Sequence, residues 1–285
     1  MGESEVIHET DQPVTRQSIA DDLRGLGVKP GMTLLVHSSL SSLGWVCGGA
    51  QAVLLALKDA TGESGTLVMP AHSSALSDPA QWSNPPVPEH WWPRIREQMP
   101  AFDPKMTPTR EMGQIAELFR TLPGVLRSSH PQLSFAAIGP QAQSITAKHE
   151  LDMGLGEGSP LARIYELGGY VLLLGVGHGS NTSIHLAEYR CAAATSTATK
   201  TITESAPVIH QGEPTWMSIK NLDLNNDDFA QIGQALETTC SSVSDSSSDS
   251  DVTVRSGSVG NAQAKLISQP KLVDFATKWM TDNRS

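Results

Sequence analysis

The fold of this chain is decided by residues 33–69, which read TLLVHSSLSSLGWVCGGAQAVLLALKDATGESGTLVM. Residues 33–37 and 65–69 are short apolar runs next to turn-forming residues, a pattern that predicts buried strands. Residues 50–59, between the two runs, have the apolar spacing of a helix. A strand, a helix and a second strand in this order favour parallel pairing and predict an α/β fold.

The strongest signal for a buried strand lies further along, at residues 170–176, YVLLLGV. A glycine-rich loop follows, and Asn181 or Thr182 can cap a helix that runs to about Ala193. The same criteria predict a strand at residues 133–138 and helices at residues 15–26, 112–122, 141–148 and 160–167.

Residues 70–110 differ from both flanks because they are rich in proline and contain Trp82, Trp91 and Trp92. Proline prevents long regular elements, and a long loop inside a compact domain is usually functional or disordered. The tryptophans favour an ordered, packed excursion. We therefore expect this segment to form one wall of a binding cleft.

The C-terminal third has a different character. Residues 199–209 and 214–219 are strand-like and joined by a turn, which predicts a hairpin, and residues 241–251 predict a mobile Ser/Asp-rich loop. Helices are expected at residues 227–237, 260–267 and 271–280. We expect a polar N-terminal tail (1–14) before a single domain (15–285), itself made of a core (15–194) and a C-terminal subdomain (195–285).

The formal net charge of −10 and the lack of a Lys/Arg cluster argue against nucleic acid as a partner. An acidic surface suits a cationic ligand, although it can also serve solubility alone. Three scattered cysteines fit a reducing compartment, and no apolar run is long enough to predict a membrane span. These features favour a cytoplasmic protein with no membrane partner.

The sharpest group of chemically active residues is His185 and Glu188, on the helix that follows the strongest strand. Their spacing of three places them on one face of the helix, where a carboxylate can orient an imidazole and support it as a general base. An exposed surface pair with no catalytic role has the same spacing, so both interpretations stay open.

Other patterns are weaker. The His37-Ser38-Ser39 loop can hold an anion at a helix N-terminus, and Arg110 and Arg127 can meet a phosphate or form ordinary ion pairs. No spacing typical of a zinc site or of a serine-hydrolase elbow occurs, so neither a metal nor a serine nucleophile is expected.

Taken together, several segments resemble the aminoglycoside 3-N-acetyltransferase family, in the family's order over about residues 15–279. The Ser/Asp-rich stretch departs from the family pattern but lies outside the matched motifs. The resembling segments are residues 35–44, 49–53, 65–70, 102–104, 115–120, 127–131 with Ser134, 156–160, 181–188 and 259–262.

The resemblance implies a three-layer α/β/α fold with a mixed sheet and a smaller strand-helix C-terminal portion. It implies acetyl-CoA as donor, the 3-amino group of a 2-deoxystreptamine aminoglycoside as acceptor, direct transfer, and antibiotic resistance as the result. His185 then lies at the position of the family's catalytic base, supported by Glu188. The protein is expected to be a monomer or a homodimer.

The remaining site residues follow from the same resemblance. We expect contacts to CoA from His37, Ser38, Ser39, Leu40, Thr109, Arg110, Arg127 and Ser134. Carboxylates that can bind the ammonium groups of the acceptor, although each can also be structural, are Asp103, Glu117, Asp152, Glu157 and Glu204. Two alternatives remain: the same fold and donor with a different amine acceptor in biosynthesis, or a non-catalytic CoA- or ligand-binding protein.

Overall fold

A mixed sheet forms the centre of the computed structural model, which describes residues 2–194, 200–243 and 253–284. Its strands are β1 (Thr33–Ser38), β2 (Thr66–Pro70), β3 (Leu126–Arg127), β4 (Phe135–Ile138), β5 (Tyr170–Leu174), β8 (Val254–Val259) and β9 (Ala262–Ser268). They are ordered β3-β4-β2-β1-β5-β9-β8. β1 runs parallel to β2 and β5, and the other neighbouring pairs are antiparallel. The predicted parallel unit at residues 33–69 is therefore confirmed.

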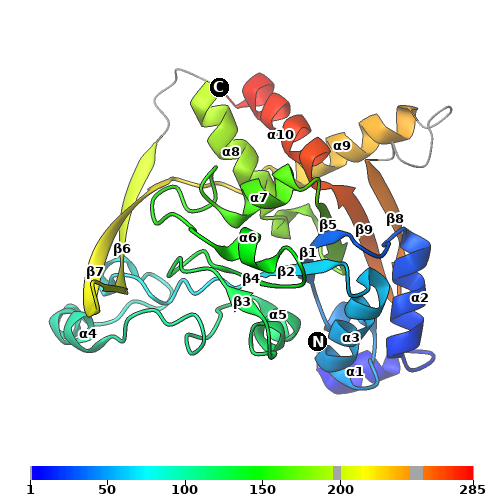
Figure 1. The fold of residues 1–285 in the computed structure, drawn as a ribbon, viewed down its shortest axis with the longest axis horizontal. Helices are drawn as coiled ribbons and strands as arrows, with labels where there is room; N and C mark the ends of the chain where they lie inside the picture. Colours follow the sequence, from blue (N-terminus) through cyan, green and yellow to red (C-terminus); the bar gives the residue numbers. More distant parts are fainter. Residues whose placement is uncertain (1, 195–199, 244–252, 285) are drawn as a thin grey trace.

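Helices cover both faces of this sheet (Figure 1). One face packs on α2 (Arg16–Leu26), α3 (Gly49–Thr61) and α5 (Gly113–Arg120). The other packs on α6 (Ala142–Thr146), α7 (Pro160–Glu166), α8 (Ser183–Ala194), α9 (Phe229–Val243) and α10 (Gln269–Asn283). Successive strand residues point to opposite faces, so Leu34 and Val36 join the first core while Leu35 joins the second. The predicted three-layer α/β/α architecture is confirmed.

Residues 70–110 form an ordered excursion beside a separate hairpin of β6 (Thr201–His210) and β7 (Glu213–Leu222). The excursion contains only short elements, η2 (Pro79–Gln81), η3 (Glu89–Trp91) and α4 (Trp92–Gln98), as its prolines predict. Trp216 Nε1 donates to the Arg96 carbonyl at 2.7 Å, and Phe102 N donates to the Pro207 carbonyl at 2.8 Å. Figure 1 shows α4 and the hairpin together at one end of the molecule.

The helix predicted at residues 260–267 is wrong, because this segment is strand β9, paired with β8 across a turn at Gly260. Ala262, Ala264 and Leu266 are buried and alternate with Gln263 and Lys265, which is the period of a strand. β8 and β9 also extend the central sheet. Strands β8 and β9 of the C-terminal portion are therefore part of the main layer structure.

The N-terminal segment expected to be a polar tail contains helix α1 (Glu3–His8), whose Val6 is buried. The Thr10 hydroxyl accepts a hydrogen bond from Trp45 N at 2.8 Å, which ties this segment to the loop after β1. Most of the Ser/Asp-rich stretch (244–251) and the start of the proposed C-terminal subdomain (195–199) lie outside the described residues.

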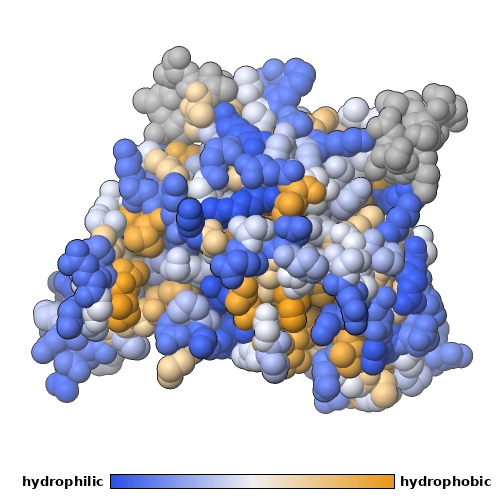
Figure 2. Space-filling view, in the orientation of Figure 1, coloured by the Kyte–Doolittle hydropathy of each residue, from blue (hydrophilic) through white to orange (hydrophobic). Residues whose placement is uncertain are grey.

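The surface in the orientation of Figure 1 is mostly hydrophilic, with apolar groups gathered in the lower middle and over the hairpin on the left (Figure 2). Within the described part of the chain, no helix combines the length and apolar character needed to cross a membrane.

Candidate active site

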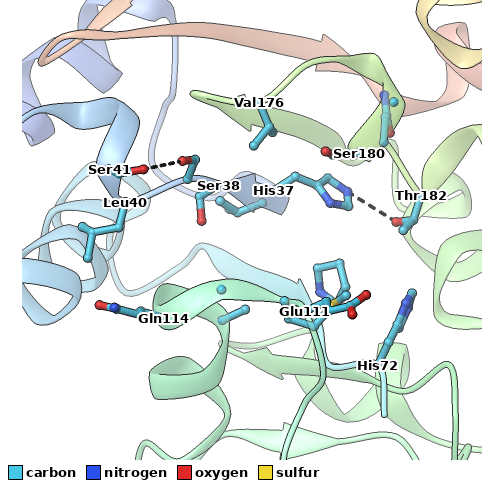
Figure 3. A pocket seen from close by; sticks show the side chains of 18 of the residues that line it. His37, Ser38, Leu40, Ser41, His72, Glu111, Gln114, Val176, Ser180 and Thr182 are labelled. Carbon is cyan, nitrogen blue, oxygen red and sulfur yellow. Dashed lines mark hydrogen bonds between the residues drawn. The ribbon is translucent and has the colours of Figure 1, made fainter. Parts of the chain in front are cut away.

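A cavity of about 1090 Å³ opens where β1, β2 and β5 end (Figure 3). Parallel strands that share an edge bring their carboxyl ends together, and ligands of α/β proteins commonly bind there. β1 and β5 are in register up to Ser38 and Leu174, so their following loops face one another. Residues that line the cavity include His37, Ser38, Ser39, Leu40, Ser41, Pro70, His72, Glu111, Gln114, Val176, Ser180, Thr182, His185 and Phe229.

His185 enters the cavity from the first turn of α8. The Asn181 side chain precedes this helix and accepts a hydrogen bond from Ser183 N at 3.2 Å, as the predicted cap requires. His185 Nδ1 donates to Glu188 Oε2 at 2.5 Å. This bond leaves Nε2 as the nitrogen that can accept a proton from a ligand, because a neutral imidazole has one protonated nitrogen.

Glu188 is buried and is held by more than His185. Its Oε1 accepts hydrogen bonds from Arg284 Nη1 at 2.7 Å and from Asn225 N at 3.2 Å. Hydrogen bonds to Asp228 and then to Glu188 raise the pKa of the Arg284 guanidinium above its ordinary value. The pair is therefore anchored by the C-terminal end of the chain, far from α8 in sequence.

Two further imidazoles line the same cavity. Burial, with a smaller contribution from a charge on His185, lowers the pKa of His37 to about 3. Burial likewise lowers the pKa of His72 to about 3, again with a contribution from His185. Both rings are neutral at ordinary pH. His37 Nε2 lies 3.3 Å from Thr182 Oγ1, and Figure 3 shows the ring reaching toward Thr182.

The residues expected to contact CoA divide into two groups. His37, Ser38, Ser39 and Leu40 line the cavity, whereas Thr109, Arg110, Arg127 and Ser134 do not. Thr109 donates through its backbone and hydroxyl to Glu117. The half-buried Arg127 guanidinium donates to Ser134 Oγ, to Ser73 Oγ and to the carbonyls of Ala71 and Thr107, and it braces the excursion. These contacts give Arg127 a structural role that needs no phosphate ligand.

The carboxylates expected to bind the acceptor do not gather in the cavity. Asp103 accepts from its own loop at Lys105 N (2.7 Å), and Asp152 accepts from Lys220 N (2.8 Å). Glu157 pairs with Arg190 at 2.7 Å.

The other two candidate carboxylates are also held locally. Glu117 pairs with Arg120, and although burial alone would raise its pKa, hydrogen bonds from Arg120 and Thr109 lower that pKa to about 2. Glu204 is half-buried on β6 beside Asn221, and burial raises its pKa. From the segment 70–110, only Pro70 and His72 line this cavity.

Sequence patterns did not single out several residues that shape the site. His72 follows the buried strand β2, a position that could have been recognised in the same way as that of His37 near the end of β1. Phe229, whose ring centroid lies 4.8 Å from that of His185, and Arg284 have no local signal, because only the tertiary fold brings them to α8. No group of three or more His, Cys, Asp or Glu side chains in the described ranges is arranged to hold a metal ion.

The fold and site together define an α/β protein with a cavity at the ends of its parallel strands and an imidazole–carboxylate pair able to take a proton from a ligand. Residues 35–281 match the model of the aminoglycoside 3-N-acetyltransferase family. The chain therefore belongs to this family of acyltransferases.

Relatives cover nearly the whole chain. The SPbeta prophage-derived aminoglycoside N(3')-acetyltransferase-like protein YokD of Bacillus subtilis (strain 168) is 48% identical, over 98% of this chain and 97% of its own. Its crystal structure superposes with a TM-score of 0.90, over 99% of this chain and 98% of that chain at 47% identity.

Two others carry more specific descriptions. Aminoglycoside N(3)-acetyltransferase VII of Streptomyces paromomycinus is 33% identical, over 99% of this chain and 96% of its own. A structure described as AAC-IIIb binary with CoASH has a TM-score of 0.80 at 31% identity, over 95% of this chain and 97% of that chain.

Proposed function

We propose that this protein transfers the acetyl group of acetyl-CoA directly to the 3-amino group of 2-deoxystreptamine aminoglycosides, and so confers resistance to them. The observation that carries the proposal is the 2.5 Å hydrogen bond between His185 and the buried Glu188, with His185 facing a large cavity. Relatives described as aminoglycoside N(3)-acetyltransferases, and one described with CoA bound, support the acceptor and the donor.

His185 is the proposed general base. An ammonium group has no lone pair for attack, so the amine must lose a proton before or during its reaction with the thioester carbonyl. His185 Nε2 accepts this proton. Glu188 holds Nδ1–H and stabilises the imidazolium that forms, as a buried carboxylate does beside a catalytic histidine. The chemistry then needs only the amine and thioester held in line, with no covalent enzyme intermediate.

The charge of the cavity favours a cationic acceptor. Among the described residues that line it, the formally charged side chains other than histidine are Glu3 and Glu111, and no Lys or Arg is among them. Figure 3 shows Glu111 across the cavity from His37. The side chains of Glu3 and Glu111 are both exposed, and Glu111 lies 3.8 Å from Arg110. Carboxylates at the mouth of a cavity still attract a multivalent cation and steer its approach. A basic or neutral lining would instead have favoured a different amine acceptor.

Acetyl transfer can be tested by mixing the protein with acetyl-CoA and a panel of 2-deoxystreptamine aminoglycosides and following release of free thiol. We expect release that depends on the aminoglycoside, and a product that carries the acetyl group on the 3-amino nitrogen. A product acetylated elsewhere would contradict the regiochemistry. If no aminoglycoside in the panel causes thiol release, while calorimetry still detects CoA binding, the result would point to another amine acceptor.

A further inference from the structure

Acyl transfer needs a group that stabilises the negative charge on the thioester oxygen, and neither His185 nor Glu188 can supply it. When the amine nitrogen bonds to the carbonyl carbon, the C=O electron pair moves onto the oxygen. The oxyanion then re-forms the carbonyl as the C–S bond breaks. CoA leaves as a thiolate, which takes up the second proton lost by the amine nitrogen and becomes the free thiol. A hydrogen-bond donor aimed at this oxygen is commonly worth a factor of about 10² to 10³ in kcat.

We propose that His37 and Thr182 together form this donor, as an imidazole–hydroxyl pair that binds the carbonyl oxygen of the acetyl group. The inference rests on the acetyl transfer proposed above and adds two catalytic residues to it. Both side chains line the cavity that contains His185. Thr182 lies three residues before His185, and the His37 and His185 rings are near enough for their charges to interact.

The pair presents a donor whichever way its protons are arranged. A neutral imidazole has one N–H and threonine has one O–H, and one of these is used in the 3.3 Å contact between Nε2 and Oγ1. If the Thr182 hydroxyl donates to Nε2, then Nδ1–H of His37 is left. If Nε2–H donates to Thr182, the hydroxyl hydrogen is left. Within the described part of the chain, Nδ1 of His37 makes no hydrogen bond, and this atom is not fully enclosed by protein. It is therefore open to a ligand in the cavity.

One nearby backbone donor is already used. The N–H of Ser39, in the loop after β1, donates to the Leu174 carbonyl at 2.9 Å. His37 also stays neutral, because burial holds its pKa near 3. A neutral donor does not repel the positive charge that His185 acquires when it takes the proton of the amine.

The proposal predicts an effect on turnover without an effect on CoA binding. His37→Leu removes the ring donor, and we expect kcat to fall about 100-fold while the dissociation constant of CoA, which has no acyl oxygen, changes less than threefold. His37→Asn keeps a side-chain N–H and should recover part of the loss. Thr182→Val should cost about tenfold and Thr182→Ser less than threefold. Thr238→Val, on the exposed side of α9, is the matched threonine control.

A spectroscopic measurement tests the contact without turnover. Acetyl-CoA labelled with carbon-13 at the carbonyl is bound to each variant with no acceptor, and its carbonyl stretch is recorded by infrared difference spectroscopy. We expect a lowered frequency in the wild type and in His185→Ala, and a return toward the solution value in His37→Leu and Thr182→Val. If His37→Leu does not fold, Thr182→Val and Thr182→Ser test the same contact.

The inference is overturned if the carbonyl frequency is the same in Thr182→Val and in the wild type, or if the loss in His37→Leu appears only as weaker CoA binding. The proposed function fails independently of it. A wild type that lowers the carbonyl frequency but acetylates no aminoglycoside would keep the donor pair and refute the acceptor.

Discussion

Two histidine–glutamate pairs involve residues in or just after the loop that follows β5. The pairs contain the same kinds of side chain but differ in their surroundings. His185 and Glu188 lie on α8, 2.5 Å apart, with Arg284 behind the carboxylate. His178 and Glu237 join η4 (His178–Ser180) to α9, 2.8 Å apart, with Lys265 bound to the same carboxylate at 2.7 Å. In each pair, one carboxylate contacts both an imidazole and a cationic side chain.

The pairs differ in what the second ring nitrogen can reach. His185 lines the cavity, whereas Nδ1 of His178 is enclosed and has no partner among the described residues. Helix α9 packs against the His178 ring at Gly233, and the resulting burial lowers the pKa of His178 even though Glu237 raises it. A carboxylate beside a histidine does not by itself give that histidine access to a substrate. The ring needs one nitrogen for the carboxylate and one open to the substrate.

The largest expected difference between the pairs is in turnover. His185→Ala should lower kcat about 10³-fold, because the proposed general base is lost, and should leave the CoA dissociation constant within threefold. His178→Ala should lower kcat less than tenfold. Steady-state thiol release and calorimetry with CoA measure both. Comparable losses of kcat in the two variants would mean that His185 and His178 do not differ in their role in turnover.

Glu188→Gln should have the next largest effect, a fall in kcat of about 10². The amide holds Nδ1 less firmly and does not stabilise the imidazolium, while the side-chain volume is kept. Arg284 keeps its bonds to Asp228 in this variant but loses its ion pair with the buried Glu188, so the midpoint of thermal unfolding should also fall. Glu237→Gln is the matched substitution in the other pair, and a larger kcat loss there than in Glu188→Gln would reverse the assignment.

Gly233→Ala should destabilise the fold by about 1–3 kcal/mol, because the new Cβ would lie 2.0 Å from Cγ of the enclosed His178 ring. Gly25→Ala is the helical control, since its Cβ meets nothing within 4 Å and alanine favours a helix. Urea unfolding should show opposite signs for the two changes. Equal stability of Gly233→Ala and wild type would mean that α9 does not press on His178.

The smallest effect concerns pH. Because burial lowers the pKa of His178, the folded state takes up a proton at a lower pH than the unfolded state, which gains one below about pH 6.5. This group therefore contributes stability above that pH and loses it on acidification. Between pH 7 and 6 the wild type should lose more stability than His178→Gln, measured by urea unfolding at each pH. If His178→Gln lost more stability than the wild type on acidification, the predicted direction of the effect would be wrong.

Much of the fold could be predicted because its signals are local. Buried parallel strands are continuous apolar runs, so β1, β2 and β5 stand out in the sequence. The error at residues 260–267 came from a short apolar segment where helix and strand periods compete. There the glycine turn at Gly260 and the alternation of Ala262, Ala264 and Leu266 were the better guide.

The candidate site was predictable only in part. The His185–Glu188 pair is visible in sequence because three residues on a helix bring two side chains together. From the sequence, acidic residues such as Asp103 and Asp152 are equally suitable for binding a cationic acceptor. In the fold, however, each of these two side chains accepts a hydrogen bond from a backbone N–H. The sequence shows the same residue type whether a carboxylate binds a ligand or stabilises a loop. Only its neighbours in the fold distinguish these two roles.

The sequence by itself determined the strand–helix–strand unit and the pair on α8, since both depend on the regular periods of short segments. Only the tertiary structure decided which histidine meets a cavity and which carboxylate meets Arg284. It also decided that His37 faces Thr182 across a gap of 145 residues in the chain. Those relations depend on the order of strands in the sheet and on which helix covers which face, and packing between distant segments sets both.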